Sequence, residues 1–126
     1  MASPHKKILI VEDNKELTKV LTSALSNEDT SILEAHNGEE GLALALKEHP
    51  DLILLDVVMP KMDGIMMLQK IRKDAWGKNT SVIVLTNLSD QNRVADAMAE
   101  GVFDYLIKDD WSLDDIIARV NAKLRV

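Results

Sequence analysis

The sequence contains no cysteine, which excludes disulfide bonds and metal sites built on thiolates. It also lacks a long apolar run, because its first apolar stretch, Ile8–Val11, is followed at once by Glu12 and Asp13. A secretory signal needs about 7–15 apolar residues, and a membrane helix needs about 20. These absences predict a cytoplasmic protein with no membrane partner.

Positive charge is also scarce, with 15 lysines and arginines against 21 acidic residues and a net charge of -6. Short basic stretches such as His5-Lys6-Lys7 occur, but the sequence has no extended basic run. A nucleic-acid-binding surface needs a basic face, so no direct nucleic-acid partner is expected. The length of 126 residues suits one compact domain.

Three short runs are wholly apolar, namely Ile8–Val11, Leu52–Leu55 and Val82–Leu85. Runs of this length without a polar face indicate parallel strands that are covered by helices on both sides. Two further segments, Ser31–His36 and Val102–Ile107, mix apolar and polar residues. We predict that these two form strands at the edges of the sheet.

Apolar residues spaced three and four apart occupy the segments between these runs and predict five helices. The helices are marked by apolar residues within 17–25, 42–46, 65–71, 94–98 and 113–124. The predicted caps are Asp13 or Asn14, Asn37, Asp90 and Ser112 at helix starts and Gly101 at the end of the fourth helix. Alternation of strand and helix predicts a doubly wound, flavodoxin-like α/β fold. We expect a five-stranded parallel sheet of order 2-1-3-4-5 with five helices on both faces.

Polar residues follow four of the predicted strands. Glu12-Asp13 comes after the first strand, Asp56 after the third, Thr86 after the fourth and Lys108 after the fifth. The carboxyl ends of parallel strands meet at one edge of the sheet, where ligands of such folds bind. Each residue alone has a structural explanation as a turn residue, a helix cap or a solvated charge. The complementary charges of the whole set favour a functional site.

Three carboxylates in one cleft repel one another unless a proton is retained or a cation is bound. Oxygen ligands without histidine or cysteine suit a hard ion such as Mg²⁺. A carboxylate beside such an ion and a lysine is a competent nucleophile for phosphorus and needs no general base. The sequence therefore favours Asp56 as a nucleophile, with Lys108 neutralising the transferred group and Thr86 holding one of its oxygens.

The chain resembles the response-regulator receiver domains of two-component signalling across essentially its whole length. The residues that carry the resemblance are Glu12-Asp13, Asp56 in the stretch LLDVVMP, Met62-Asp63-Gly64, Thr86, and Tyr105 with Lys108 in the stretch YLIK. The resemblance assigns residues 6–126 to a receiver domain. We expect residues 1–5 to form a disordered N-terminus.

The resemblance implies that Asp56 accepts phosphate from a sensor histidine kinase or a histidine phosphotransfer protein. Asp13, Asp56 and the main-chain oxygen of Val58 would bind Mg²⁺ or Mn²⁺, with Glu12 assisting. Such a domain catalyses its own phosphorylation and slow dephosphorylation rather than the turnover of an external substrate.

The resemblance also implies a conformational switch. Lys108 would contact the phosphoryl oxygens, Thr86 would move toward them, and Tyr105 would rotate inward. The surface formed by the fourth helix, fifth strand and fifth helix would then change its downstream protein partner. A phosphorylation-dependent homodimer and the question of a stand-alone protein or a piece of a longer one are left open.

The chain departs from the family pattern at two positions. Asp109 follows Lys108 where the family usually has proline, and we predict a trans peptide bond there because a non-proline cis bond costs about 3–4 kcal/mol. Asn87 follows Thr86 where the family usually has a very small residue. Together with Val58, Asn87 is expected to modulate access to the phosphorylation site and so to alter its kinetics.

Three alternative functions are compatible with parts of the sequence. The runner-up is a degenerate receiver that acts as a phosphorylation-independent interaction module, an alternative that rests on Asp109 and Asn87. A phosphatase of the haloacid-dehalogenase kind is disfavoured because Val58 stands where that class has its second acid. A nucleotide or flavin binder is disfavoured because no glycine-rich loop follows the first strand.

Overall fold

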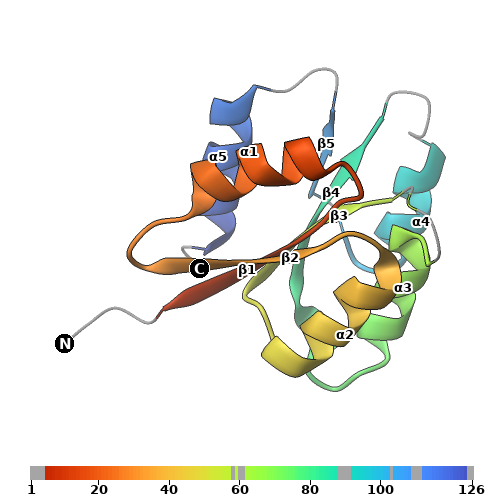
Figure 1. The fold of residues 1–126 in the computed structure, drawn as a ribbon. Helices are drawn as coiled ribbons and strands as arrows, with labels where there is room; N and C mark the ends of the chain where they lie inside the picture. Colours follow the sequence, from red (N-terminus) through yellow and green to blue (C-terminus); the bar gives the residue numbers. More distant parts are fainter. Residues whose placement is uncertain are drawn as a thin grey trace.

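A computed structural model of the protein describes residues 5–57, 59, 62–87, 92–102, 104–108 and 112–124 (Figure 1). Several predictions made above fall outside this range. They concern the main-chain oxygen of Val58, the cap at Asp90 and the Lys108–Asp109 peptide bond. His5, at the start of the described part, places its imidazole against the Ser31 hydroxyl.

Within the described residues, a single five-stranded parallel sheet has the order β2-β1-β3-β4-β5. All four strand pairs are parallel, which confirms the predicted fold class and order. The central strands β1, β3 and β4 are almost completely buried, whereas the edge strands β2 and β5 are partly exposed. The strands are β1 (Lys6–Val11), β2 (Thr30–Ala35), β3 (Leu52–Asp56), β4 (Ser81–Thr86) and β5 (Asp104–Ile107).

The helices cover both faces of the sheet, as predicted. Figure 1 shows α1 and α5 on one face and α2, α3 and α4 on the other. Among the described residues, no helix is long and apolar enough to cross a membrane. The helices are α1 (Lys15–Leu25), α2 (Gly38–Glu48), α3 (Gly64–Arg72), α4 (Val94–Ala99) and α5 (Leu113–Leu124), and a 3₁₀ turn, η1, spans Gly77–Asn79.

The sheet divides the core into two apolar layers, because successive side chains of a strand point to opposite faces. In β1, Ile8 and Ile10 pack in the layer beneath α1 and α5, whereas Leu9 and Val11 pack in the layer beneath α2 and α3. All four side chains are almost completely buried. The apolar runs therefore look uniform in sequence because each strand serves both layers.

Helix ends are fixed by side-chain caps, most of them at the predicted positions. The Asn14 and Asn37 side chains accept hydrogen bonds from the first turns of α1 and α2. Ser112 and Asp115 bond reciprocally at the start of α5 in the manner of a capping box. Gly101 differs slightly from its prediction: the C-cap of α4 is Glu100, and Gly101 follows it with a φ of 83°.

Candidate functional site

The carboxyl edge of the sheet brings Glu12, Asp56 and Lys108 together. Glu12 directly follows β1, Asp56 is the last residue of β3, and Lys108 directly follows β5. Main-chain hydrogen bonds continue the sheet through these positions, from Glu12 N to Ala35 O at 3.0 Å and from Lys108 N to Thr86 O at 2.7 Å. The backbone of each charged residue is therefore held by the strands themselves.

The alternation of side chains along the strands explains why these three point the same way. Glu12, Asp56 and Lys108 each lie two residues after an apolar residue of the layer beneath α1 and α5. The preceding register aligns Val11 with Leu55, so Glu12 and Asp56 are neighbours across the β1–β3 pair. The side chains of these three residues therefore point to the same face of the sheet, at the carboxyl ends of the strands.

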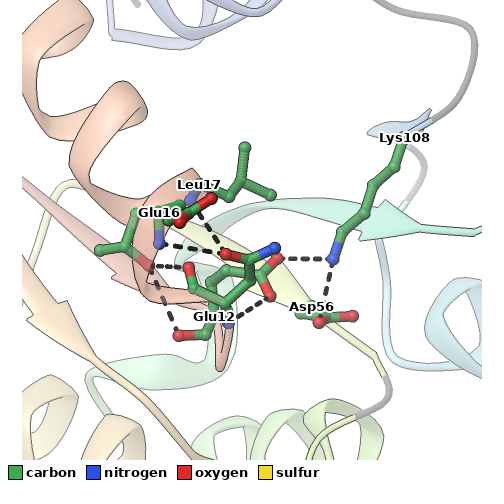
Figure 2. Close-up of polar contacts among 7 residues, drawn as sticks. Glu12, Glu16, Leu17, Asp56 and Lys108 are labelled. Carbon is green, nitrogen blue, oxygen red and sulfur yellow. Dashed lines mark hydrogen bonds and ion pairs between the residues drawn. The ribbon is translucent and has the colours of Figure 1, made fainter.

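The three side chains form a buried group of charges (Figure 2). The Lys108 Nζ lies 2.6 Å from Glu12 Oε1 and 3.1 Å from Asp56 Oδ2. The exposed fraction of the side chain is 1% for Glu12, 5% for Asp56 and 15% for Lys108. Burial of an ionised group costs several kcal/mol unless it is paired, and here the amine pairs with both acids.

The turn after β1 positions the third acid. Asn14 caps α1 with its Oδ1, which accepts hydrogen bonds from Glu16 N at 3.0 Å and Leu17 N at 3.2 Å. The main-chain N–H of Asn14 in turn donates to Glu12 Oε2 at 3.1 Å. Asp13 lies between these two fixed residues and is exposed at the surface. One carboxylate oxygen each from Glu12, Asp13 and Asp56 lies within 4.8 Å of the others.

The charges perturb one another. Burial lowers the pKa of the Lys108 amine, but its contacts with Glu12 and Asp56 outweigh this effect and leave the pKa above its ordinary value. Partial desolvation of the otherwise exposed Asp13 carboxylate raises its pKa, and the hydrogen bond and negative charge of Glu12 raise it further. A main-chain hydrogen bond and Lys108 oppose the shift only in part. The charged form of Lys108 is therefore favoured by its surroundings, whereas the charged form of Asp13 is disfavoured.

The donor set fits a divalent cation. Three carboxylates face one amine, so two negative charges remain in excess when all groups are ionised. Glu12 Oε1 is buried, and its contact with Lys108 lacks the geometry of a hydrogen bond. Oxygen ligands without histidine or cysteine favour Mg²⁺ or Mn²⁺ over zinc or copper. The site can thus hold an ion on Asp13, Asp56 and Glu12, while Val58 lies outside the described residues.

Glycine is the first residue of both α2 and α3, and it lets the starts of these helices pack closely against the loop that follows β3. A Cβ on Gly64 would lie 2.2 Å from the main-chain oxygen of Asp56, and a Cβ on Gly38 would lie 2.1 Å from that of Met62. Any side chain at either position would force the loop after β3 away from its place. The Asp63-Gly64 pair belongs to the sequence motif Met62-Asp63-Gly64, whereas Gly38 follows the predicted cap Asn37. The close contact of Gly38 with Met62 joins residues far apart in sequence, so no local sequence pattern predicts it.

Thr86, Asn87 and Tyr105 lie beside the charged group rather than within it. The Thr86 side chain is buried, and its hydroxyl donates to the Asn87 carbonyl at 3.3 Å. Thr86 and Val84 lie two residues apart in β4, so their side chains point to the same face of the sheet, the face covered by α2, α3 and α4. Tyr105 of β5 is the neighbour of Val84 in the strand register. Tyr105 is 38% exposed, and Asn87 is also exposed. The predicted roles of these three residues stay predictions.

Comparison with known proteins agrees with this geometry. A family model described as the response regulator receiver domain matches residues 8–121. The transcriptional regulatory protein HprR of Escherichia coli (strain K12) is 39% identical over 119 residues, which cover 94% of this chain and 52% of that protein. This chain spans about half the length of the curated relatives it matches.

Solved structures show the same likeness. The receiver domain of the Francisella response regulator 1452 is 32% identical, with a TM-score of 0.82 over 96% of this chain and 98% of that one. A CheY chain from Borrelia burgdorferi, solved in a complex with CheX, BeF₃ and Mg²⁺, is 30% identical with a TM-score of 0.80. That match covers 93% of this chain and 87% of that one.

Proposed function

The chain belongs to the response-regulator receiver family, and from this premise we propose that it accepts a phosphoryl group on Asp56 in a Mg²⁺-dependent reaction. The donor would be a phosphohistidine on a sensor histidine kinase or on a histidine phosphotransfer protein. The observation that carries the proposal is the contact of the buried Asp56 carboxylate with the Lys108 amine, at 3.1 Å, beside two further acids.

Asp13 and Asp56 would hold the ion, with Glu12 assisting and the main-chain oxygen of Val58 as a further ligand. When bound, the ion would neutralise negative charge on the site and on the incoming phosphoryl group. The excess of two negative charges among the described side chains supports this assignment. The related CheY chain from Borrelia burgdorferi, whose complex contains Mg²⁺ and BeF₃, supports it as well.

In the transfer step, an oxygen of Asp56 attacks phosphorus and forms a new O–P bond. The N–P bond of the phosphohistidine breaks, and its electron pair stays with the imidazole nitrogen, which leaves as the neutral donor side chain once it is protonated. Lys108, already charged and directed at Asp56, stabilises the negative oxygens of the transferred group. No side chain has to remove a proton from the nucleophile, because a carboxylate is already ionised.

The phosphoryl group would then bias a conformational equilibrium. Thr86 would give up its bond to the Asn87 carbonyl and donate to a phosphoryl oxygen, and Tyr105 would turn from its exposed position inward. The surface of α4, β5 and α5 would change its affinity for a downstream partner or for a second copy of the chain. A shift from 1:99 to 99:1 needs a difference of about 5.5 kcal/mol in affinity for the two states.

Incubation with acetyl phosphate and Mg²⁺ tests the proposal directly. We expect mass spectrometry to detect one phosphoryl group on Asp56. No phosphoryl group should form when Mg²⁺ is chelated beforehand or in the variant Asp56→Asn. Asp74→Asn is the matched control, because Asp74 lies in a loop where it accepts a hydrogen bond from Trp76 N, which asparagine can also accept. An unmodified wild-type protein would contradict the proposal and favour the phosphorylation-independent interaction module.

A further inference from the structure

The starts of α3 and α4 are joined by an ion pair. Arg93 Nη2 lies 3.1 Å from Asp63 Oδ2, and Arg93 Nε lies 3.4 Å from Asp96 Oδ2. The first contact connects two helices that are far apart in sequence, whereas the second stays within the first turn of α4. The Arg93 and Asp63 side chains are 30% and 28% exposed, so water weakens the contact without abolishing it.

Asp63 is anchored to the main chain that carries Asp56. Its Oδ1 caps α3 by accepting a hydrogen bond from Met66 N at 2.9 Å. The next residue, Gly64, donates its amide to Val57 O at 3.1 Å and leaves no room for a Cβ against Asp56 O. The Asp63 end of the ion pair is therefore fixed independently of Arg93.

The Arg93 end is held far less firmly. Helix α4 has six residues, and its first turn has no side-chain cap. The opposite end of α4 is closed by hydrogen bonds from Gly101 N to Met98 O at 3.0 Å and from Val102 N to Ala97 O at 3.1 Å. Arg72 Nε also donates to the Glu100 carbonyl there, at 2.8 Å. Loss of the Arg93 contact would thus free the start of α4 and leave its end in place.

The start of α4 is connected through the chain to the predicted phosphoryl site. Thr86 is the last residue of β4, and the chain runs from it to Arg93 at the start of α4. The Thr86 hydroxyl donates a hydrogen bond to the carbonyl of the next residue, Asn87. A phosphoryl oxygen that takes this hydroxyl would release the Asn87 carbonyl, which precedes α4 in the chain. A start of α4 that is paired with Asp63 resists any shift that this release transmits to it.

We propose that the Asp63–Arg93 ion pair is a latch that holds α4 in its resting position and opposes occupation of the phosphoryl site. The proposal rests on the proposed function, because it concerns the regulation of the same site. By thermodynamic linkage, a contact that favours the resting state must weaken binding of any ligand that favours the other state. Removal of the latch should therefore strengthen ligand binding.

Binding of fluoroberyllate in the presence of Mg²⁺ measures this coupling, with the affinity followed by ¹⁹F NMR. We expect Arg93→Gln and Asp63→Asn each to lower the dissociation constant by about two- to fivefold, which is the range available from a partly exposed ion pair. The double variant should bind no more tightly than either single variant, because both remove the same contact. Asparagine at position 63 can still cap α3, so the helix start is preserved.

The sign of the effect separates the latch from general electrostatics. Arg93→Gln removes a positive charge near an anion site and, without a latch, would weaken binding, whereas Asp63→Asn removes a negative charge and would strengthen it. The latch predicts stronger binding in both. Asp96→Asn is the matched control, because it breaks only the contact within α4, and it should change the affinity less than either latch variant.

Three outcomes would count against the latch. Unchanged or weaker binding by Arg93→Gln, with wild-type binding intact, would refute the latch and leave the proposed function standing. Absence of any Asp56-dependent binding by the wild type would refute the proposed function and the latch with it. Hydrogen exchange without ligand is a second measurement: amides at the start of α4 should exchange faster in Arg93→Gln, with α3 unchanged. Equal exchange in both proteins would also count against the latch.

Discussion

Two groups of ion pairs in this protein use the same chemistry in different surroundings. Around Lys108, the amine lies between Glu12 and Asp56, whose side chains are 1% and 5% exposed. Around Arg93, the guanidinium lies between Asp63 and Asp96, whose side chains are 28% and 58% exposed. The first group lies at the end of the sheet, and the second lies at the surface between two helices.

The difference shows how burial divides the two functions that we assign. Charges that are buried interact strongly and are costly to leave unpaired, so the Lys108 group suits the binding of an ion and a phosphoryl group. Charges that are partly exposed interact weakly, so the Arg93 group suits a contact that must form and break. The acid excess at the buried group also gives an incoming cation a reason to bind there.

The largest effect is expected when the buried amine is removed. Lys108→Met leaves Glu12 and Asp56 facing each other without a cation, so the free energy of unfolding without Mg²⁺ should fall by about 3 kcal/mol. The pKa of the amine is raised above 10.5, so its stabilisation is complete below pH 10.5 and is lost as the pH rises through the raised value. Urea unfolding at pH 7 with a chelator therefore measures it in full.

Lys123→Met is the matched control for that variant. Lys123 Nζ lies 2.5 Å from Asp104 Oδ2, but the two side chains are 36% and 33% exposed. Its removal should therefore cost less than about 1 kcal/mol. Equal losses in the two lysine variants would remove the distinction between buried and exposed pairs.

The next largest effect is expected at Asn87, whose carbonyl accepts the hydrogen bond from the Thr86 hydroxyl. Its exposed side chain follows Thr86, where we predict that it obstructs a phosphodonor and displaces the attacking water. We expect Asn87→Ala to be phosphorylated faster by acetyl phosphate and to shorten the phosphoryl lifetime by about two- to tenfold, which corresponds to a barrier lowered by about 0.4–1.4 kcal/mol. The decay of the phosphorylated protein, with Asn79→Ala as a remote control, provides the measurement. An unaltered lifetime would show that Asn87 does not modulate access.

A smaller gain in stability is expected from Asp13→Asn. The pKa of Asp13 is raised in the folded protein by burial and by Glu12. Its ionisation therefore opposes folding at pH 7, and this penalty is relieved as the pH falls through the raised value. Because the side chain is exposed, solvent screening limits the gain from Asp13→Asn to less than about 1 kcal/mol. Thermal unfolding of the two proteins without divalent ions, from pH 7 downward, should show a difference that narrows with acidity.

The smallest effect is expected from Arg93→Gln, measured as stability rather than as affinity. Both contacts of Arg93 are partly exposed, so the free energy of unfolding should fall by at most about 1 kcal/mol. A loss comparable to that of Lys108→Met would mean that the Arg93 group is a structural support and would remove the contrast between the two groups.

The sheet and the charged edge were predictable from sequence for one physical reason. Strands buried on both faces are continuous apolar runs, so Asp56 stands out at the end of its run, and the parallel order then places it beside Glu12. Contacts between elements far apart in sequence were not predictable. The pairing of Arg93 with Asp63 and the approach of Gly38 to Met62 depend on how helices dock, for which no local pattern exists.

Helix ends were predictable where the cap is a side chain with its own hydrogen bond. Asn37 and Ser112 fulfil this condition. The start of α4 does not, because the Arg93 side chain at its N-cap position makes no capping hydrogen bond with the helix main chain. The roles of Thr86 and Tyr105 also exceed what a single state can reveal, since both depend on a change between two states.

The excess negative charge of Glu12, Asp13 and Asp56 is proposed to bind a divalent cation. Calorimetric titration with MgCl₂, compared with KCl of equal ionic strength, tests this central claim most directly. We expect one Mg²⁺ to bind the wild-type protein and binding to be lost or strongly weakened in Asp13→Asn and Asp56→Asn. Heat that is the same for both salts, or binding that persists in both variants, would contradict a divalent-ion site formed by Glu12, Asp13 and Asp56.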